Sequence, residues 1–372
     1  RFEQIRVQVE AELGVSLEVA FASFEQDPIA CASIAQVHRA ILAHETEEVV
    51  VKVQRPDISG QIESDLNILH FLARQVERNV PDLALMDPVG IVVEFDRAIH
   101  KELDFRNERR NMSRFSDNFS SFEGLRVPRV HDAYCTAKVL TMEFVRGVKI
   151  TRAPQELGVD PSAVSKRMLQ ALFKMIFGDG CFHGDLHPGN IFIVPSGEIV
   201  LIDFGLMGRL TREQRDSVLD MLIGLSKQDY QVVARVFFEL GIKQPGVIYD
   251  YDRFEADVIE VMEQHIMGRI LSEMDIGAFF TDLVAGAIRH QIKMPPTYTM
   301  VFKALITVEG IGKTLAPEVN FIAEAEPFVK EMLAERYNPS RLVKEAADTL
   351  ATISRFSRRF PRVAMQLLQD IS

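Results

Sequence analysis

A chain of 372 residues with 47% hydrophobic and 26% charged residues has the composition of a folded globular protein, because disordered chains combine few apolar residues with high net charge. Its length exceeds that of one ordinary core and predicts two packed lobes. The formal net charge of −11 argues against nucleic acid as a partner, since neutralising phosphates requires clustered Lys and Arg.

The cysteines and the apolar runs restrict the compartment and the class of protein. Cys31, Cys135 and Cys181 form no CxxC pair and no zinc-ligand pattern, so we expect a reducing compartment and no structural metal. Apolar runs such as 191–194 are far shorter than the roughly 18 residues that span a bilayer. Because the sequence begins with Arg1 and shows no signal-peptide pattern, we expect a piece of a longer protein.

The first part of the chain predicts a small sheet interrupted by helices. Helices are predicted where apolar residues recur at three- and four-residue steps, over 1–20, 57–79 and 88–119. Strands are predicted over 36–42, 48–54, 126–134 and 138–145. A turn signal at Arg146-Gly147 sets the boundary between a lobe of residues 1–146 and a second lobe of residues 147–372.

The second lobe is predicted to be mostly helical. A strongly apolar helix is expected over 162–178, followed by a hairpin of 191–194 and 198–203 around Pro195-Ser196-Gly197. From Thr211 onward the pattern is almost wholly helical, with breaks at Gly and Pro residues. A small mixed sheet with inserted helices, followed by a helical lobe, predicts an α+β fold.

The strongest chemical signal is His183-Gly-Asp-Leu-His-Pro-Gly-Asn190, followed by Asp203-Phe-Gly205 at the end of a predicted strand. Phosphoryl transfer from a nucleotide needs a carboxylate that orients the acceptor, oxygen ligands for Mg²⁺, and a cation on the α- and β-phosphates. We assign the first role to Asp185 and the metal-ligand roles to Asn190 and Asp203.

Two other interpretations of this segment stay open at the level of sequence. In the first, residues 183–190 are a Gly- and Pro-rich surface turn and Asp203-Phe-Gly205 is a chance tripeptide. This interpretation explains the composition of the two segments but not their order around a predicted hairpin. Zinc ligation by His183, Asp185 and His187 is the second, because these residue types are ligands. It leaves Asn190 and Asp203 unexplained.

Lys52 stands alone in the apolar run Val49-Val-Val-Lys-Val53. An unpaired ammonium is costly to bury, so Lys52 is expected to meet a carboxylate and a phosphate; the alternative is an edge-strand lysine that faces water. Spacing does not choose its carboxylate: Glu63 lies on the first inserted helix, and the acidic run 101–108 lies on the second. That run is also consistent with a solvated helix face.

The segment before the lysine strand, residues 28–38, contains no glycine where ordinary kinases carry a Gly-rich loop. Its backbone amides could face phosphates, but Cβ atoms limit positive φ and close approach. We therefore expect an unusual nucleotide geometry; the alternative is a segment of small residues used for packing.

Together these segments resemble the UbiB, or AarF-domain, family of atypical kinases. The resemblance rests on the alanine-rich run at 30–38, Val-Lys-Val-Gln-Arg-Pro at 51–56, Glu-Leu-Asp-Phe-Arg-Asn-Glu at 102–108, the segment 183–190 and Asp203-Phe-Gly205. It is dense over about residues 10 to 210 and looser in the helical remainder. It implies a two-lobed protein-kinase-like fold.

The resemblance also implies roles for individual residues. Lys52 would bind phosphates and pair with Glu102 rather than Glu63, and Glu108 would be a second acid of the same motif. Asp185, Asn190 and Asp203 would act as assigned above. Nucleotide contacts would come from the alanine-rich loop and from backbone groups of the hinge, at Ala30, Ala32, Ser33, Met142, Glu143 and Val145.

The cofactors implied are ATP or ADP with Mg²⁺, and the activity is that of a kinase or ATPase whose acceptor the sequence does not reveal. The family supports ubiquinone biosynthesis at membranes, which implies prenyl-lipid precursors or lipid-biosynthesis proteins as partners, on the cytoplasmic side or inside an organelle. The basic, aromatic-interleaved run 355–362 is a candidate contact with anionic lipid, or a helix-end charge cluster.

The sequence departs from the family pattern at one motif, and two other functions are compatible with its motifs. The family's Lys-x-Gly-Gln motif, which belongs N-terminal to this region, does not occur in the sequence, so autoinhibition by that motif has no support here. A small-molecule phosphotransferase resembling aminoglycoside or choline kinases shares the HGDxxxxN pattern, although the alanine-rich loop argues against it. A pseudokinase scaffold that binds nucleotide as a switch is the non-enzymatic alternative.

Overall fold

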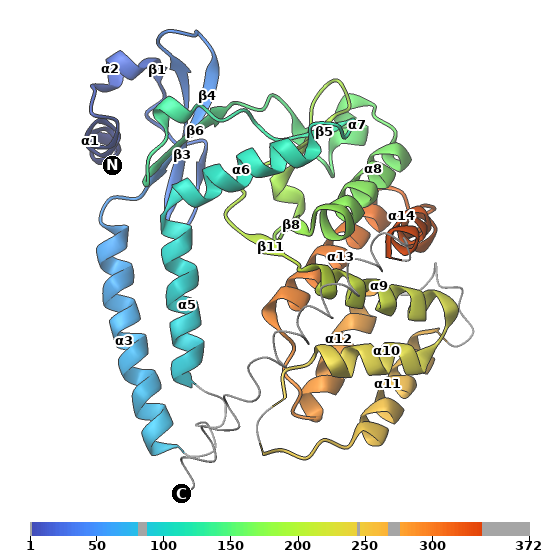
Figure 1. Ribbon diagram of the computed structural model, residues 1–372. Helices are drawn as coiled ribbons and strands as arrows, with labels where there is room; N and C mark the ends of the chain where they lie inside the picture. The colour runs from blue at the N-terminus through green and yellow to red at the C-terminus, as the bar shows by residue number, and fades with distance from the viewer. Residues whose placement is uncertain (1, 81–87, 244–245, 267–275, 337–372) are drawn as a thin grey trace, which may run out of the picture.

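The computed structural model describes residues 2–80, 88–243, 246–266 and 276–336. Within these ranges a small sheet with two long inserted helices is followed by a second small sheet and a set of packed helices (Figure 1). The predicted α+β architecture is therefore confirmed. The basic run 355–362 lies outside the described residues.

The first sheet is antiparallel, in the order β1 (Phe21–Phe24), β3 (Ala35–Leu42), β4 (Glu48–Gln54) and β6 (Val139–Glu143), with β2 (Ala30–Cys31) paired to β3. Helices α1 (Phe2–Leu13) and α2 (Leu17–Ala20) cover one face, where Val49, Val51 and Val53 are buried with Ile5 and Val9. Because side chains alternate along a strand, Lys52 lies on the opposite face, toward the rest of the molecule.

The second inserted helix is broken where the sequence predicted continuity. Instead of one helix over 88–119, α5 (Pro88–Leu103) ends and α6 (Phe105–Phe119) begins across Asp104. The Asp104 backbone is extended, at φ −99° and ψ 96°, and its carboxylate accepts a hydrogen bond from the Arg106 N–H, which caps α6. As a result α5 runs beside α3 (Ile58–Asn79), away from the sheet, while α6 crosses between the two sheets (Figure 1).

The second sheet has the order β5 (Leu125–Arg126), β10 (Ile199–Leu201), β9 (Ile191–Ile193) and β7 (Val148–Lys149). The predicted hairpin is confirmed, with Ile199 opposite Ile193. The strand expected over 126–134 is wrong for most of its length, because after β5 the chain forms the turn η1 (Asp132–Tyr134). β5 precedes residue 146 yet pairs with β10, so the two sheets do not divide at that residue.

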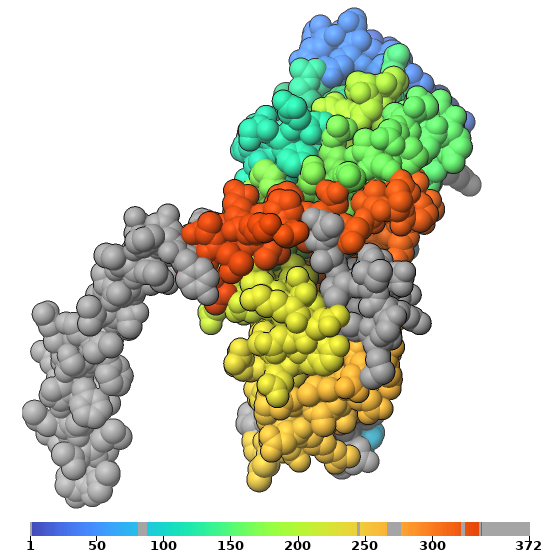
Figure 2. All heavy atoms as spheres, turned by 90° about the vertical axis from the view of Figure 1, so that its right-hand side faces the viewer, coloured from blue at the N-terminus to red at the C-terminus, as the bar shows by residue number. Residues whose placement is uncertain are grey.

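Residues 183–190, called the catalytic-loop segment below, begin at the end of β8 (Cys181–His183), which pairs with β11 (Met207–Arg209), and include the turn η3 (Pro188–Asn190). The remaining described helices are α7 (Ala153–Leu157), α8 (Pro161–Phe173) continued by the π-helical η2 (Lys174–Asp179), α9 (Arg212–Lys227), α10 (Tyr230–Leu240), α11 (Tyr251–Ile266), α12 (Ile276–Arg289), α13 (Pro296–Leu315) and α14 (Phe321–Arg336). In Figure 2 the orange-red α13 and α14 form a band between the green residues above and the yellow helices below. Among the helices described, none is both long and apolar enough to cross a bilayer.

Candidate nucleotide and phosphoryl-transfer site

Lys52 is held in the middle of the first sheet, opposite Val37 of β3 and Leu140 of β6. The alternative of an edge-strand lysine is therefore wrong. Its Nζ donates to both carboxylate oxygens of Glu108, at 3.0 and 2.8 Å, and the two side chains are 13% and 4% exposed. Burial opposes the charge on Lys52, but Glu108 and Asp203 outweigh it and raise its pKa.

The prediction that Glu102 pairs with Lys52 is wrong in this structure. Glu102 lies near the end of α5 and is exposed, whereas Glu108 lies on α6 beyond the break at Asp104. Glu63 is not the partner either, since its carboxylate accepts a hydrogen bond from His100 at 2.8 Å. A signal in the sequence could have identified Glu108: it falls in the buried stripe of α6, which consists of Phe105, Glu108, Met112, Phe115 and Phe119.

Asp203 is a second carboxylate beside the Lys52 ammonium group. Its Oδ1 lies 3.6 Å from Lys52 Nζ, and the side chain is 50% exposed. Its φ of +62° is a left-handed conformation that L residues seldom adopt, which indicates a constrained position. The next residue, Phe204, is fully buried beside Phe115 and His183, and its carbonyl accepts a hydrogen bond from Asn111 of α6 at 2.9 Å.

The catalytic-loop segment is fixed by His183. Its Nδ1 accepts the Asp185 N–H at 3.1 Å, so Nε2 carries the proton and donates to the Ile202 carbonyl at 3.2 Å. Burial lowers the pKa of this histidine, which favours that neutral form. Because both ring nitrogens are in use, the zinc alternative loses its first ligand, and His183 acts as a structural link between the loop and Asp203.

Asn190 and Asp203 end up on adjacent backbone segments. The Asn190 carbonyl accepts the Ile202 N–H at 3.0 Å, one residue before Asp203. The Asn190 side chain is buried, and its Nδ2 donates to the Asp185 carbonyl at 3.1 Å, which leaves the amide oxygen as its metal-binding atom. Amide and carboxylate oxygens are hard ligands that suit Mg²⁺.

The alanine-rich loop turns without help from glycine. Ala30 pairs with Val37, and the Ala32 N–H donates to the Ala35 carbonyl at 2.8 Å. Positive φ is recorded for no residue between 28 and 38, all of which are described. The residues predicted to contact nucleotide, Ala30, Ala32 and Ser33, are all exposed, and their role stays a prediction.

Hydrogen bonds within the protein limit which backbone groups of the predicted hinge, residues 142–145, are available to adenine. The Glu143 N–H donates to the Arg129 carbonyl at 2.8 Å, so in this structure that group is not free for adenine. The Glu143 carboxylate binds Arg126 of β5 through two bonds of 2.8 Å, which ties the two sheets together. Met142 is buried and Val145 follows the end of β6; adenine contact at these positions stays a prediction.

Lys303 is the residue at this site that the sequence analysis missed. It lies on α13, and its Nζ donates to Asp185 Oδ1 at 2.8 Å. A lysine within a largely apolar helix far along the chain carries no local sign of this contact, so only the folded structure could reveal it.

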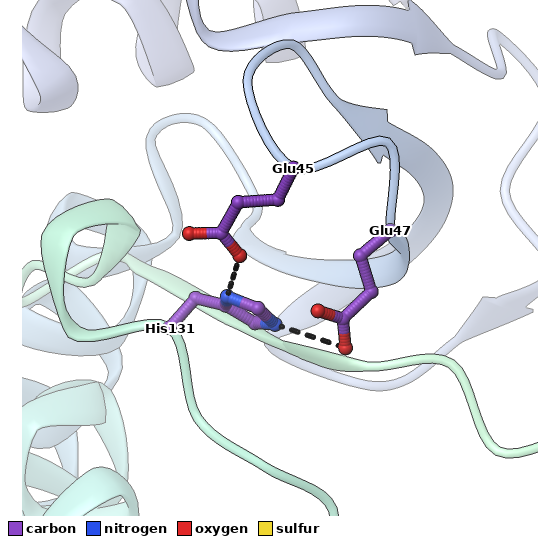
Figure 3. Close-up of side chains that lie close together, drawn as sticks. All are labelled: Glu45, Glu47 and His131. Atoms are coloured by element: carbon purple, nitrogen blue, oxygen red, sulfur yellow. Dashed lines mark ion pairs between the residues drawn. The ribbon is translucent and has the colours of Figure 1, made fainter.

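A second cluster lies at the far end of the first sheet, where His131 is buried between Glu45 and Glu47 (Figure 3). The two carboxylates face different ring nitrogens, at 3.5 Å from Nδ1 and 3.6 Å from Nε2. Glu47 also forms an ion pair with Arg129. Because Arg129 already neutralises Glu47 and the two carboxylates lie at different ring nitrogens, this cluster is better described as a structural contact between the β3–β4 turn and η1 than as a metal site.

Comparisons with known proteins identify the family and the fold of this chain. A family model described as the ABC1 atypical kinase-like domain matches residues 1–237, and one described as the UbiB helical domain matches residues 259–320. A probable protein kinase UbiB of Pseudomonas paraeruginosa is 34% identical over 358 residues, covering 94% of this chain and 66% of the relative. One of Marinobacter nauticus is 32% identical over 375 residues, covering 99% and 68%.

The chain therefore spans about two thirds of the length of these curated relatives. Among solved structures, a complex of Rv3197 from Mycobacterium tuberculosis with erythromycin has a TM-score of 0.67 at 22% identity, covering 88% of this chain and 82% of that one. At this identity the likeness concerns the fold alone.

Proposed function

This chain belongs to the ABC1, or UbiB, family of atypical kinase-like proteins, and from that premise we propose that it binds ATP with Mg²⁺ and transfers or hydrolyses the γ-phosphoryl group. The observation that carries the proposal is the buried Lys52–Glu108 ion pair with Asp203 beside it. In kinases the lysine–glutamate pair and the metal-binding aspartate must both be in place for turnover.

Each residue has a part in this proposal. Lys52, fixed by Glu108, would bind the α- and β-phosphates as a point charge. Asn190 and Asp203 would hold Mg²⁺, which when bound neutralises charge on the phosphate oxygens. Asp185, anchored through its backbone to His183, would accept the proton of the acceptor hydroxyl or of water. The presence of all four polar groups argues against the pseudokinase alternative.

We further propose that turnover supports ubiquinone or related prenyl-lipid metabolism. Support comes from the family resemblance and from the relatives called UbiB. The test is complementation: a curated UbiB relative whose matching region is replaced by this chain is expected to restore ubiquinone in a bacterium lacking its own UbiB, and the same protein with Asp203→Asn is expected to fail. Normal ubiquinone with both proteins would show that the metal-binding aspartate is dispensable for this role.

Nucleotide binding is tested by thermal unfolding with ATP or ADP, each with and without Mg²⁺. Ligand at a hundredfold its dissociation constant stabilises the native state by about 2.7 kcal/mol. A magnesium-dependent upward shift is expected for the wild type and for Asp117→Asn, which alters an exposed carboxylate of α6, but a smaller one for Asp203→Asn. Absence of any shift with either nucleotide would contradict the proposal.

A further inference from the structure

Helix α13 brings a second cation to the phosphoryl-transfer site. Lys303 Nζ donates to Asp185 Oδ1 at 2.8 Å, while the other oxygen, Oδ2, lies 3.6 Å from His187 Nε2. Among the described lysines and arginines, Lys303 is the one paired with Asp185. His187 is itself fixed, because its Nδ1 accepts the Gly189 N–H at 2.9 Å and caps η3.

Lys303 projects from a tightly packed part of helix α13. Its neighbours Val301, Phe302, Ala304 and Leu305 are all buried, so Lys303 is the exposed residue in an otherwise buried turn. The Phe302 ring stacks on Phe280 with ring centroids 4.4 Å apart, and α13 packs against α8 and β11. A charged side chain that leaves a packed helix at a fixed point can hold its partner in one place.

Lys52 does not replace Lys303 as the group that holds Asp185. Lys52 is already bound to both oxygens of Glu108 and lies beside Asp203, on the side of the site assigned to the nucleotide. Asp185, assigned to the acceptor, has a half-buried carboxylate, and Lys303 is the group that holds its Oδ1 at hydrogen-bond distance. Efficient proton transfer requires that this carboxylate be held within hydrogen-bond reach of the acceptor.

We propose that Lys303 is a positioning residue for phosphoryl transfer: it binds Oδ1 of Asp185 and holds the carboxylate so that Oδ2, the oxygen beside His187, is the one that accepts the proton. This inference rests on the proposed function for its catalytic consequence, but the contact itself does not. Asp185 lies in the segment that matches the ABC1 domain and Lys303 in the segment that matches the UbiB helical domain. The helical domain thereby completes the site instead of only supporting it.

The catalytic test compares Lys303→Met with Lys303→Arg. We expect Lys303→Met to lower kcat for ATP hydrolysis by about 10- to 100-fold, the effect of misplacing a catalytic group by about 1 Å, with little change in KM for Mg·ATP. Lys303→Arg should recover most of kcat. In Asp185→Asn, adding Lys303→Met should cause little further loss, because two residues that act as a unit are not additive.

A second measurement does not depend on turnover. Amide hydrogen exchange of residues 184–190 is expected to be several-fold faster in Lys303→Met than in the wild type or in Lys303→Arg. The matched control is Lys330→Met, which removes an exposed lysine paired with Glu326 on α14 and should leave this segment unchanged.

The outcomes separate the two proposals. Unchanged exchange and unchanged kcat in Lys303→Met would overturn the role of Lys303 while leaving the proposed function intact. Faster exchange in a protein that neither binds nor hydrolyses nucleotide would support the positioning contact and contradict the proposed function. A fall in kcat that Lys303→Arg does not recover would also count against positioning by charge.

Discussion

Replacing Glu108 by glutamine tests which acid supports Lys52. The Glu108 side chain is 4% exposed and accepts both hydrogen bonds from a lysine that is 13% exposed. Removing one partner of a buried ion pair costs about 3–5 kcal/mol, because it leaves an uncompensated charge. Asp203 lies 3.6 Å from Lys52, and glutamine keeps one acceptor oxygen, so we expect a loss near the lower limit, about 3 kcal/mol.

Glu102→Gln is the matched control, six positions earlier in the same acidic run. Glu102 is exposed, so its replacement should change the free energy of unfolding by no more than about 0.5 kcal/mol. Urea unfolding followed by circular dichroism measures both variants. A third protein, Lys52→Met with Glu108→Leu, should recover much of the lost stability, since apolar residues can replace a buried ion pair without loss.

The reasoning would be refuted if Glu102→Gln lost stability while Glu108→Gln did not. It would also be refuted if the double replacement were as unstable as Glu108→Gln, because the loss would then not come from a charge left without its partner.

Two further predictions concern titration and reactivity. The pKa of His100 is raised by its hydrogen bond to the Asp96 backbone and by Glu63, and the pKa of Asp96 is lowered by His70. The stabilisation of the α3–α5 contact by His100 is therefore present below about pH 6.5 and is lost as the pH rises above this value. The stabilisation by Asp96 is present at higher pH and is lost only as the pH falls below about 4. Hydrogen exchange of α3 and α5, corrected for the intrinsic rate, should show the most protection between these limits, and protection independent of pH would contradict this. Burial raises the pKa of Cys135 to about 11. In the native state at pH 8, iodoacetamide should therefore label the exposed Cys31 well before Cys135 or the buried Cys181. Labelling is measured by mass spectrometry of the peptides, and equal labelling of the three cysteines would contradict the prediction.

Patterns within a single element were predictable from the sequence. The valine run around Lys52 predicted a buried strand, and the hairpin of β9 and β10 followed from two apolar runs around Pro195-Ser196-Gly197. Both depend on side-chain alternation and turn chemistry, which act over a few residues. The same locality explains why roles for Asp185 and Asn190 could be proposed together from one short segment.

The failures arose where a tertiary contact or a cap overrode a continuous pattern. Apolar residues recur through 88–119 without interruption, yet the Asp104 carboxylate caps a new helix there and turns the chain. Beyond that turn Glu108, and not Glu102, makes the hydrogen bonds with Lys52, while Glu102 acts on Lys52 only as a weaker nearby charge. Lys303 was missed for another reason, since its contact with Asp185 joins residues that are distant in sequence and depends on how α13 packs.

Helix α6 explains why the parts of the site come together. Over less than three turns it provides Glu108 to Lys52, the Asn111 amide to the Phe204 carbonyl, and the Phe115 ring to the Phe204 ring. The first contact reaches the first sheet, and the other two hold the residue next to Asp203. Because one rigid helix makes all three contacts, Lys52 and Asp203 cannot move apart without breaking them. The position of α6, set by the cap at Asp104, therefore couples the phosphate-binding cation to the metal-binding aspartate, and α13 adds Asp185 to the same frame from the opposite side through Lys303.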